Sequence, residues 1–73
     1  MSKASKNRIK YPFVIRSLSA KEGGGFLIKF PDLPGCISDG ESIGEAINMG
    51  KKAVKAWIST AKKMNLVIPK PSS

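Results

Sequence analysis

A seven-residue stretch with two prolines and a glycine, residues 30–36, constrains the fold of this chain more than any other feature. Pro31 and Pro34 lack a backbone N–H and have a fixed φ, so they cannot both lie in a central strand. Gly35 can adopt a positive φ at little cost, which suits a sharp turn. The stretch therefore predicts a rigid turn with a structural role rather than a reactive site. The predicted motif consists of Pro31, Asp32, Leu33, Pro34, Gly35 and Cys36.

Apolar patterns on both sides of this turn predict three short strands. Residues 11–18 are rich in β-branched and aromatic types, and residues 26–30 alternate with two phenylalanines and an isoleucine on one face. Residues 36–39 follow the turn and precede an Asp-Gly pair, which is a strong turn signal. Short connections between such strands indicate an antiparallel meander.

Residues 19–25 contain three consecutive glycines and predict a flexible hairpin connection. A phosphate-binding loop would need further spaced glycines, a Lys-Ser/Thr pair and a following helix. A predicted strand follows these glycines instead, so the phosphate-binding interpretation is rejected.

One long helix is predicted over residues 43–64, with Ser42 as N-cap and Glu45 completing a reciprocal capping box. Its apolar arc contains several small residues, which would let the helix approach the sheet closely. Asn65 suits a left-handed helix end, and residues 66–68 are a candidate for a short fourth strand. The predicted arc is Ile43, Ala46, Ile47, Gly50, Ala53, Val54, Trp57, Ile58, Ala61 and Met64.

The predicted fold class is therefore α+β in the order β-β-β-α-β, with a three-stranded antiparallel sheet and one helix packed on one face. We expect a disordered basic arm at residues 1–9, one domain at residues 10–68 and a flexible tail or linker at residues 69–73. The sheet face that carries Leu27 and Lys29 has no predicted cover, so we expect it to be shared in a homodimer, and the edge strand at residues 11–18 is the other candidate dimer contact.

The net charge of +8, from thirteen Lys and Arg against five acids, has two interpretations. Five lysines fall on about a third of the circumference of the predicted helix, opposite its apolar arc. This lysine ridge is either a solvated face or a surface that binds a polyanion. It consists of Lys51, Lys52, Lys55, Lys62 and Lys63.

Several kinds of chemistry are missing from the sequence. The chain has no histidine, so the commonest general base and metal ligand is absent, and no cofactor is expected. Cys36 is interpreted as a small buried residue. Asp32, Asp39 and Glu41 could hold Mg²⁺ only if they converged, and carboxylates in turns more often form the turns. Without an apolar run of about 20 residues or a signal peptide, the protein is expected in the cytoplasm and not in a membrane.

Across residues 11–72 the sequence resembles the HicB antitoxin family. The resemblance rests on Gly24-Gly25-Phe26, Phe30-Pro31-Asp32-Leu33-Pro34-Gly35-Cys36, Asp39-Gly40-Glu41-Ser42, Glu45-Ala46, Trp57, Ile68-Pro69 and Pro71-Ser72. It implies a degraded ribonuclease H-like fold without the acidic catalytic set. It also implies a function: binding and neutralising a HicA-type toxin, a small ribonuclease that cleaves messenger RNA with a histidine.

Many relatives in that family continue into a DNA-binding domain, whereas this sequence stops at Ser73, so DNA binding is not expected from this chain alone. The toxins are commonly basic, and a net charge of +8 matches a basic partner poorly. The alternative function is a small nucleic-acid-binding module that uses the lysine ridge and the basic arm. A cryptic Mg²⁺ nuclease is the least favoured interpretation, because it needs convergent carboxylates.

Overall fold

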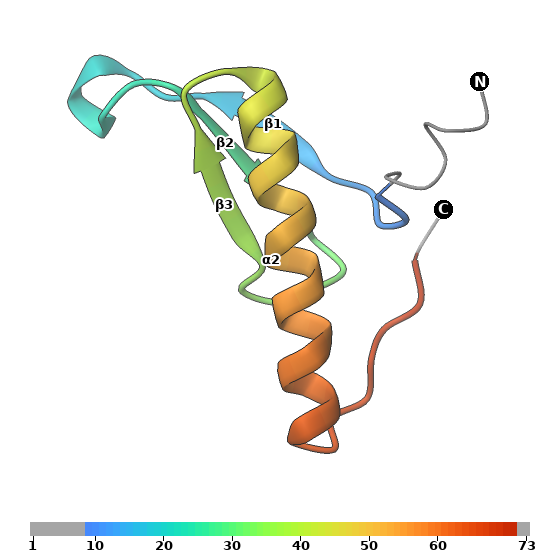
Figure 1. The fold of residues 1–73 in the computed structure, drawn as a ribbon. Coiled ribbons are helices and arrows are strands. Elements are labelled where there is room, and N and C mark those ends of the chain that lie inside the picture. The colour runs from blue at the N-terminus through green and yellow to red at the C-terminus, as the bar shows by residue number, and fades with distance from the viewer. Residues whose placement is uncertain (1–8, 72–73) are drawn as a thin grey trace.

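The computed structural model describes residues 9–71 and has one long helix lying across one face of a three-stranded sheet (Figure 1). The strands are antiparallel and neighbours in sequence are neighbours in space, in the order β1-β2-β3. This arrangement confirms the predicted α+β class. The elements are β1 (Val14–Ser17), the 3₁₀ turn η1 (Ala20–Glu22), β2 (Phe26–Lys29), β3 (Ile37–Gly40) and the helix α2 (Ile43–Lys63).

The strand register assigns the faces of the sheet. Ile28 in the central strand pairs with Ile15 on one side and Ser38 on the other. Ile28 is fully buried beneath α2, and Phe30, which follows the strand on the same face, is 1% exposed. The alternation in residues 26–30 therefore predicted the core face correctly, because successive side chains of a strand point to opposite faces.

A glycine in α2 allows this close packing. A Cβ atom at Gly50 would lie 2.9 Å from Cδ1 of Ile28 and 3.0 Å from Cζ of Phe30. The backbone of α2 therefore lies so close to β2 that there is room for the hydrogen of a glycine but not for a methyl group without a shift. The small residues of the helix predicted this close approach. Gly50 lowers helix propensity by about 1 kcal/mol relative to alanine, a cost that this packing offsets.

The ends of the predicted helix arc differ from its middle. Ile43 is 51% exposed and Met64 is 63% exposed, whereas Ala46 and Ala61 are buried. The last turns of α2 extend beyond the sheet (Figure 1), so no strand lies beneath this end of the helix. The amphipathic pattern alone did not indicate where the sheet stops.

The first strand is shorter than residues 11–18. The ladder begins at Val14, opposite Lys29, where β2 ends and the chain enters the proline turn. Pro12 has no N–H with which to extend the ladder. Tyr11 is still buried, at 8% exposure, and its hydroxyl donates to the carbonyl oxygen of Pro69 at 2.6 Å.

The candidate fourth strand at residues 66–68 is not a strand in the structure. Asn65 has φ = 57°, as predicted for the helix end, and turns the chain back along α2 (Figure 1). The returning segment runs beside residues near Tyr11, where Pro12 and Pro69 both lack the N–H groups that a ladder needs. Val67 is consequently 89% exposed instead of paired in a sheet.

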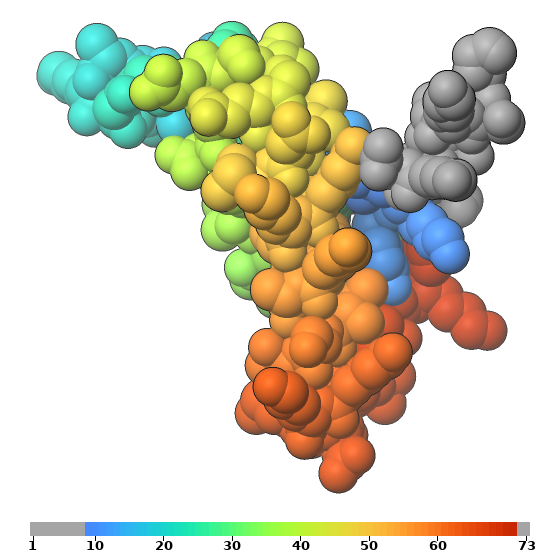
Figure 2. Space-filling view, viewed as in Figure 1, coloured from blue at the N-terminus to red at the C-terminus, as the bar shows by residue number. Residues whose placement is uncertain are grey.

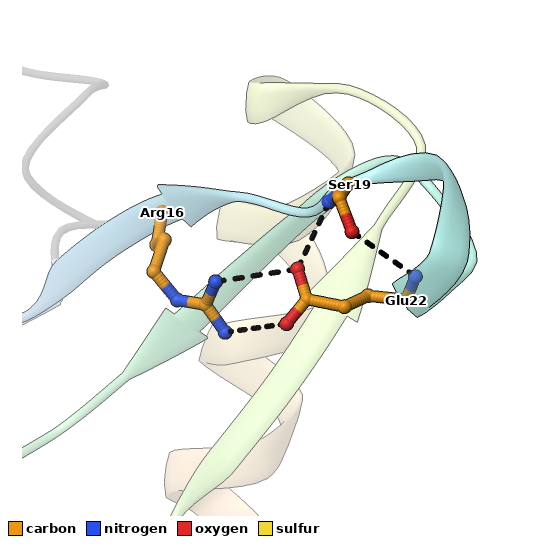
Figure 3. Close-up of polar contacts among 3 residues, drawn as sticks. All are labelled: Arg16, Ser19 and Glu22. Atoms are coloured by element: carbon orange, nitrogen blue, oxygen red, sulfur yellow. Dashed lines mark hydrogen bonds and ion pairs between the residues drawn. The ribbon is translucent and has the colours of Figure 1, made fainter.

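The hairpin connection predicted to be flexible contains an ordered 3₁₀ turn, drawn in Figure 3. Glu22 Oε1 accepts from the backbone N–H of Ser19 at 2.9 Å, and the Glu22 N–H donates to Ser19 Oγ at 3.3 Å. Arg16 forms an ion pair with the same carboxylate at 3.4 Å. The Ser19 backbone bond and the Arg16 charge lower the pKa of Glu22. This capping box was not anticipated from the sequence.

Most of the predicted basic arm, with Lys3, Lys6 and Arg8, lies outside the described residues, as does the end of the tail at residues 72–73. Ile9 packs against the core. Pro69 is half-buried and accepts the Tyr11 bond, so packing reaches one residue beyond each end of the predicted domain 10–68.

We predict that Ile28→Ala lowers the free energy of unfolding by about 2–5 kcal/mol, because it leaves a cavity under α2. Leu27→Ala, the neighbouring truncation on the opposite face, should cost less than half as much since Leu27 is only half-buried. Urea denaturation of both variants measures the difference. Equal losses would contradict the assignment of the core face.

Candidate protein-interaction site

The central turn is closed by its own backbone. The N–H of Leu33 donates to the Phe30 carbonyl at 3.0 Å, and the N–H of Cys36 donates to the Leu33 carbonyl at 2.9 Å. The N–H of Phe30 in turn donates to the Cys36 carbonyl at 3.1 Å. Gly35 has φ = 79°, in the left-handed region, as predicted. Leu33 is fully buried, so the turn is fixed to the core by this side chain.

Trp57 ties the turn to the helix. Its indole Nε1–H donates to the carbonyl oxygen of Pro34 at 2.8 Å, across 23 positions of sequence. The ring is half-buried against the core cluster, which supports the prediction that it packs in the fold instead of stacking on bases. Pro34 is exposed at the tip of the turn. The hydrogen bond from the Trp57 indole therefore fixes the position of this tip relative to α2.

An apolar groove lies between the turn, the C-terminal half of α2 and the returning segment that follows the helix. Its lining contains no charged side chain. Two apolar residues at its border remain exposed: Leu66 at 52% and Val67 at 89%. The lining residues are Pro34, Gly35, Cys36, Ile37, Ala53, Ala56, Trp57, Thr60, Ala61, Leu66, Val67 and Pro69.

Sequence reasoning did not find this groove. It interpreted residues 66–68 as a strand, and a paired strand would have left no opening beside α2. The sequence signals that could have indicated the groove are Pro69 and Pro71, which come just after residues 66–68. Proline has no backbone N–H to donate to a neighbouring strand, so these residues argue against strand pairing here.

Cys36 lies at the base of the groove with 5% exposure. Burial raises the pKa of its thiol, so the neutral form is favoured and nucleophilic reactivity is reduced. The structure therefore supports the interpretation of Cys36 as a small buried apolar residue.

The three carboxylates considered for Mg²⁺ do not converge. Asp32 is in the central turn, before β3, while Asp39 and Glu41 line a polar hollow at the far end of that strand together with Glu45. Within residues 9–71, no three His, Cys, Asp or Glu side chains are placed to hold a metal ion.

The helix N-terminus is capped, with one change from the prediction. Ser42 Oγ accepts from the Glu45 N–H at 3.0 Å, as expected. The Glu45 carboxylate, however, accepts from the backbone N–H of Glu41 and not from that of Ser42. The Glu45 side chain thus pairs with the N–H group of Glu41, one residue before Ser42. The negative charge of Glu45 still lies near the positive N-terminal end of α2.

The lysine ridge forms the face of α2 that points away from the sheet. Lys51 is half-buried, and the other four members, Lys52, Lys55, Lys62 and Lys63, are exposed. The ridge and the groove occupy adjoining but separate faces of the same helix. As for membranes, none of the helices described between residues 9 and 71 has the length and apolar character needed to span one.

The opposite face of the sheet carries Val14, Leu27, Lys29 and Ile37 in neighbouring register positions. Val14 is 57% exposed, and α2 lies on the other side of the sheet (Figure 1). No element within the described residues covers this open face, as the sequence predicted for Leu27 and Lys29.

Comparisons with known proteins point to one family. A family model described as a HicB-like antitoxin of bacterial toxin–antitoxin systems matches residues 11–73. The UPF0150 protein Ta0767 of Thermoplasma acidophilum is 34% identical over 65 residues, which cover 89% of this chain and 90% of the relative. The matched region includes the sheet, the central turn, α2 and the groove.

We predict opposite effects for alanine at two glycines. Gly35→Ala should destabilise the protein by about 1–2 kcal/mol, because a Cβ is strained at φ = 79° although the space around it is open. Gly44→Ala, in the first turn of α2 and equally unobstructed, should leave stability unchanged or raise it by up to about 1 kcal/mol. Thermal melting measures both, and a stabilised Gly35→Ala variant would contradict the turn geometry.

Proposed function

The chain belongs to the HicB-like antitoxin family of bacterial toxin–antitoxin systems, and from this premise we propose that it binds and neutralises a HicA-type ribonuclease that cleaves messenger RNA. The observation that carries the proposal is the extent of the family match, residues 11–73, which takes in every described strand and helix. Membership in an antitoxin family suggests a non-enzymatic role. The proposed site of action is the cytoplasm, where messenger RNA is translated.

We propose the apolar groove as the surface that contacts the toxin. A HicA-type toxin binds RNA and is expected to be basic, so the lysine ridge would repel it. The groove lining carries no charge, and its border exposes Leu66 and Val67. Burying such side chains is favourable by about 25 cal/mol per Å² of apolar area removed from water.

The proposed mechanism is steric. A rigid turn, fixed by Leu33 in the core and by the Trp57–Pro34 bond, presents one wall of the groove without a large ordering cost on binding. A toxin bound there would have its catalytic histidine covered, so inhibition should be stoichiometric. Because the contact is apolar, it should depend little on salt.

We also propose that the protein is a homodimer through the open sheet face. Val14 and Ile37 are both about half exposed on this face, next to Leu27. Leu27 pairs with Arg16 of β1 on one side and with Asp39 of β3 on the other. The open face therefore has a positive and a negative side chain on either side of an apolar centre. Such a patch can be self-complementary about a two-fold axis.

We predict that co-expression with a HicA-type toxin encoded next to this chain, where one is found, restores growth, and that Val67→Asp abolishes this rescue. Val67 is 89% exposed, so the charge should not disturb the fold but would be buried unpaired in the complex. Growth on induction of the toxin, with and without each antitoxin variant, gives the measurement.

The matched control is Ile43→Asp, which places the same charge on another exposed apolar residue, 51% exposed against 89% for Val67, away from the groove. An acidic residue is also favourable at the first turn of α2. Continued growth arrest with soluble, folded wild-type protein would contradict the antitoxin proposal. Equal rescue by Val67→Asp and Ile43→Asp would contradict the groove while leaving the antitoxin function intact.

For the dimer, we predict a mass close to twice the chain's 7.8 kDa in light scattering at tens of micromolar. Leu27→Lys should shift the mass to that of the monomer, since it adds a like charge beside Lys29 at the centre of the open face. A monomeric wild-type protein would remove this proposal.

A further inference from the structure

The charge on α2 is not explained by the fold or by toxin binding. The helix carries five lysines and a single acid, Glu45, whose carboxylate is engaged with the Glu41 N–H at the cap. Among residues 9–71, the one ion pair is that of Arg16 with Glu22, on the hairpin far from the ridge in sequence. The lysines of the ridge therefore present their charge to solvent without a partner in the described chain.

Helix stability accounts for only part of this pattern. Lys62 and Lys63 lie in the last turn, where cations interact favourably with the negative end of the helix. Lys51 and Lys55 are in the middle, one turn apart, where like charges repel by a few tenths of a kcal/mol. A mixed-charge face would have avoided this cost, so the central lysines point to an external anion.

The whole ridge face suits a row of phosphates. At 1.5 Å per residue, the lysines extend over about 18 Å of helix axis. At 3.6 residues per turn, the exposed polar side chains of Asn48 and Ser59 fall among them, and no apolar residue does. Asn and Ser commonly hydrogen-bond phosphate oxygens, as lysine does. The acids Asp39, Glu41 and Glu45 lie together around the start of α2, and Glu45 precedes Lys51 by about 9 Å of helix axis.

We propose that the lysine ridge binds the phosphate backbone of duplex DNA without reading its sequence. Figure 2 shows the side chains of α2, in yellow to orange, along the front face of the molecule, and Figure 1 shows the C-terminal half of α2 extending past the sheet. A helix about 10–12 Å in diameter matches the roughly 12 Å major groove of B-form DNA, whereas the major groove of A-form RNA is deep and narrow.

Single strands fit the ridge less well. Proteins that bind them stack bases on exposed aromatic rings, and the ridge has none. The one aromatic side chain of α2, Trp57, faces the turn and donates its indole N–H to Pro34. The sequence led us to expect no DNA binding from this chain alone, because many relatives bind a promoter through an additional domain. Contacts to the phosphate backbone do not require such a domain, because they need only cationic side chains. The inference therefore revises that expectation.

The test is fluorescence anisotropy of the full chain with a labelled 20-base-pair duplex of random sequence, between 50 and 200 mM salt. Five phosphate contacts predict a loss of affinity of about 500-fold over this range. The ridge variant Lys52→Gln/Lys55→Gln/Lys62→Gln should bind at least about 10-fold more weakly at 50 mM salt. Its loss of affinity over the salt range should shrink to about 10-fold.

The matched control is Lys10→Gln/Lys21→Gln/Lys70→Gln, which lowers the net charge from +8 to the same +5 but leaves the ridge intact. It should bind within about 3-fold of wild type. Circular dichroism checks that both variants fold. Equal weakening by the two variants, or no binding at 50 mM salt, would overturn the ridge as the site.

Duplex RNA and single-stranded DNA of the same length serve as competitors. Tighter binding of either would overturn the assignment to duplex DNA. The inference is independent of toxin binding, because the ridge and the groove lie on separate faces of α2. The ridge variant should therefore still restore growth in co-expression with the toxin.

Discussion

The close contact between α2 and the central strand at Gly50 is the interaction on which the rest of the structure depends. A Cβ at position 50 would lie 2.9 Å from Cδ1 of Ile28 and 3.0 Å from Cζ of Phe30, so glycine lets the helix pack here without displacing either side chain. The contact fixes the height of the helix above the sheet. Trp57, two turns further along the same helix, then lies within hydrogen-bonding distance of Pro34. The position of the central turn, and with it one wall of the groove, follows from this packing.

Sequence patterns predicted the features that depend on local chemistry. The alternation at Ile28 and Phe30, the cap at Ser42 and the left-handed residue Asn65 each have a short-range physical cause, and the structure contains all three. The Gly35 turn belongs to the same class, since proline and glycine impose their φ preferences wherever they occur.

Features that depend on contacts between distant parts of the sequence could not be predicted from local patterns. Residues 66–68 have the composition of a strand, but whether they pair depends on which backbone donors face them, and prolines in both segments remove those donors. The groove exists because this pairing fails. The capping box around Glu22 was missed because glycines dominated the interpretation of its loop, although Ser19 and Glu22 have the spacing of a box.

Charge is distributed over this small domain in separate zones. The groove carries none, the lysine ridge beside it is wholly cationic, and three of the five acids gather near the start of α2. Under the proposed function, this separation removes the conflict between a net charge of +8 and a basic toxin, because the proposed contact is at the uncharged groove. It would also leave the lysine ridge accessible to the proposed anion.

The most direct test of the proposed toxin contact is a titration of ¹⁵N-labelled protein with an inactive variant of the proposed HicA-type toxin. The proposed contact predicts the largest shift changes at the amides of Gly35, Cys36 and Val67 and at the Trp57 indole N–H, with little change at Lys52 and Lys55. Changes concentrated on the lysine ridge or on the open sheet face, with the Trp57 indole signal unmoved, would contradict it.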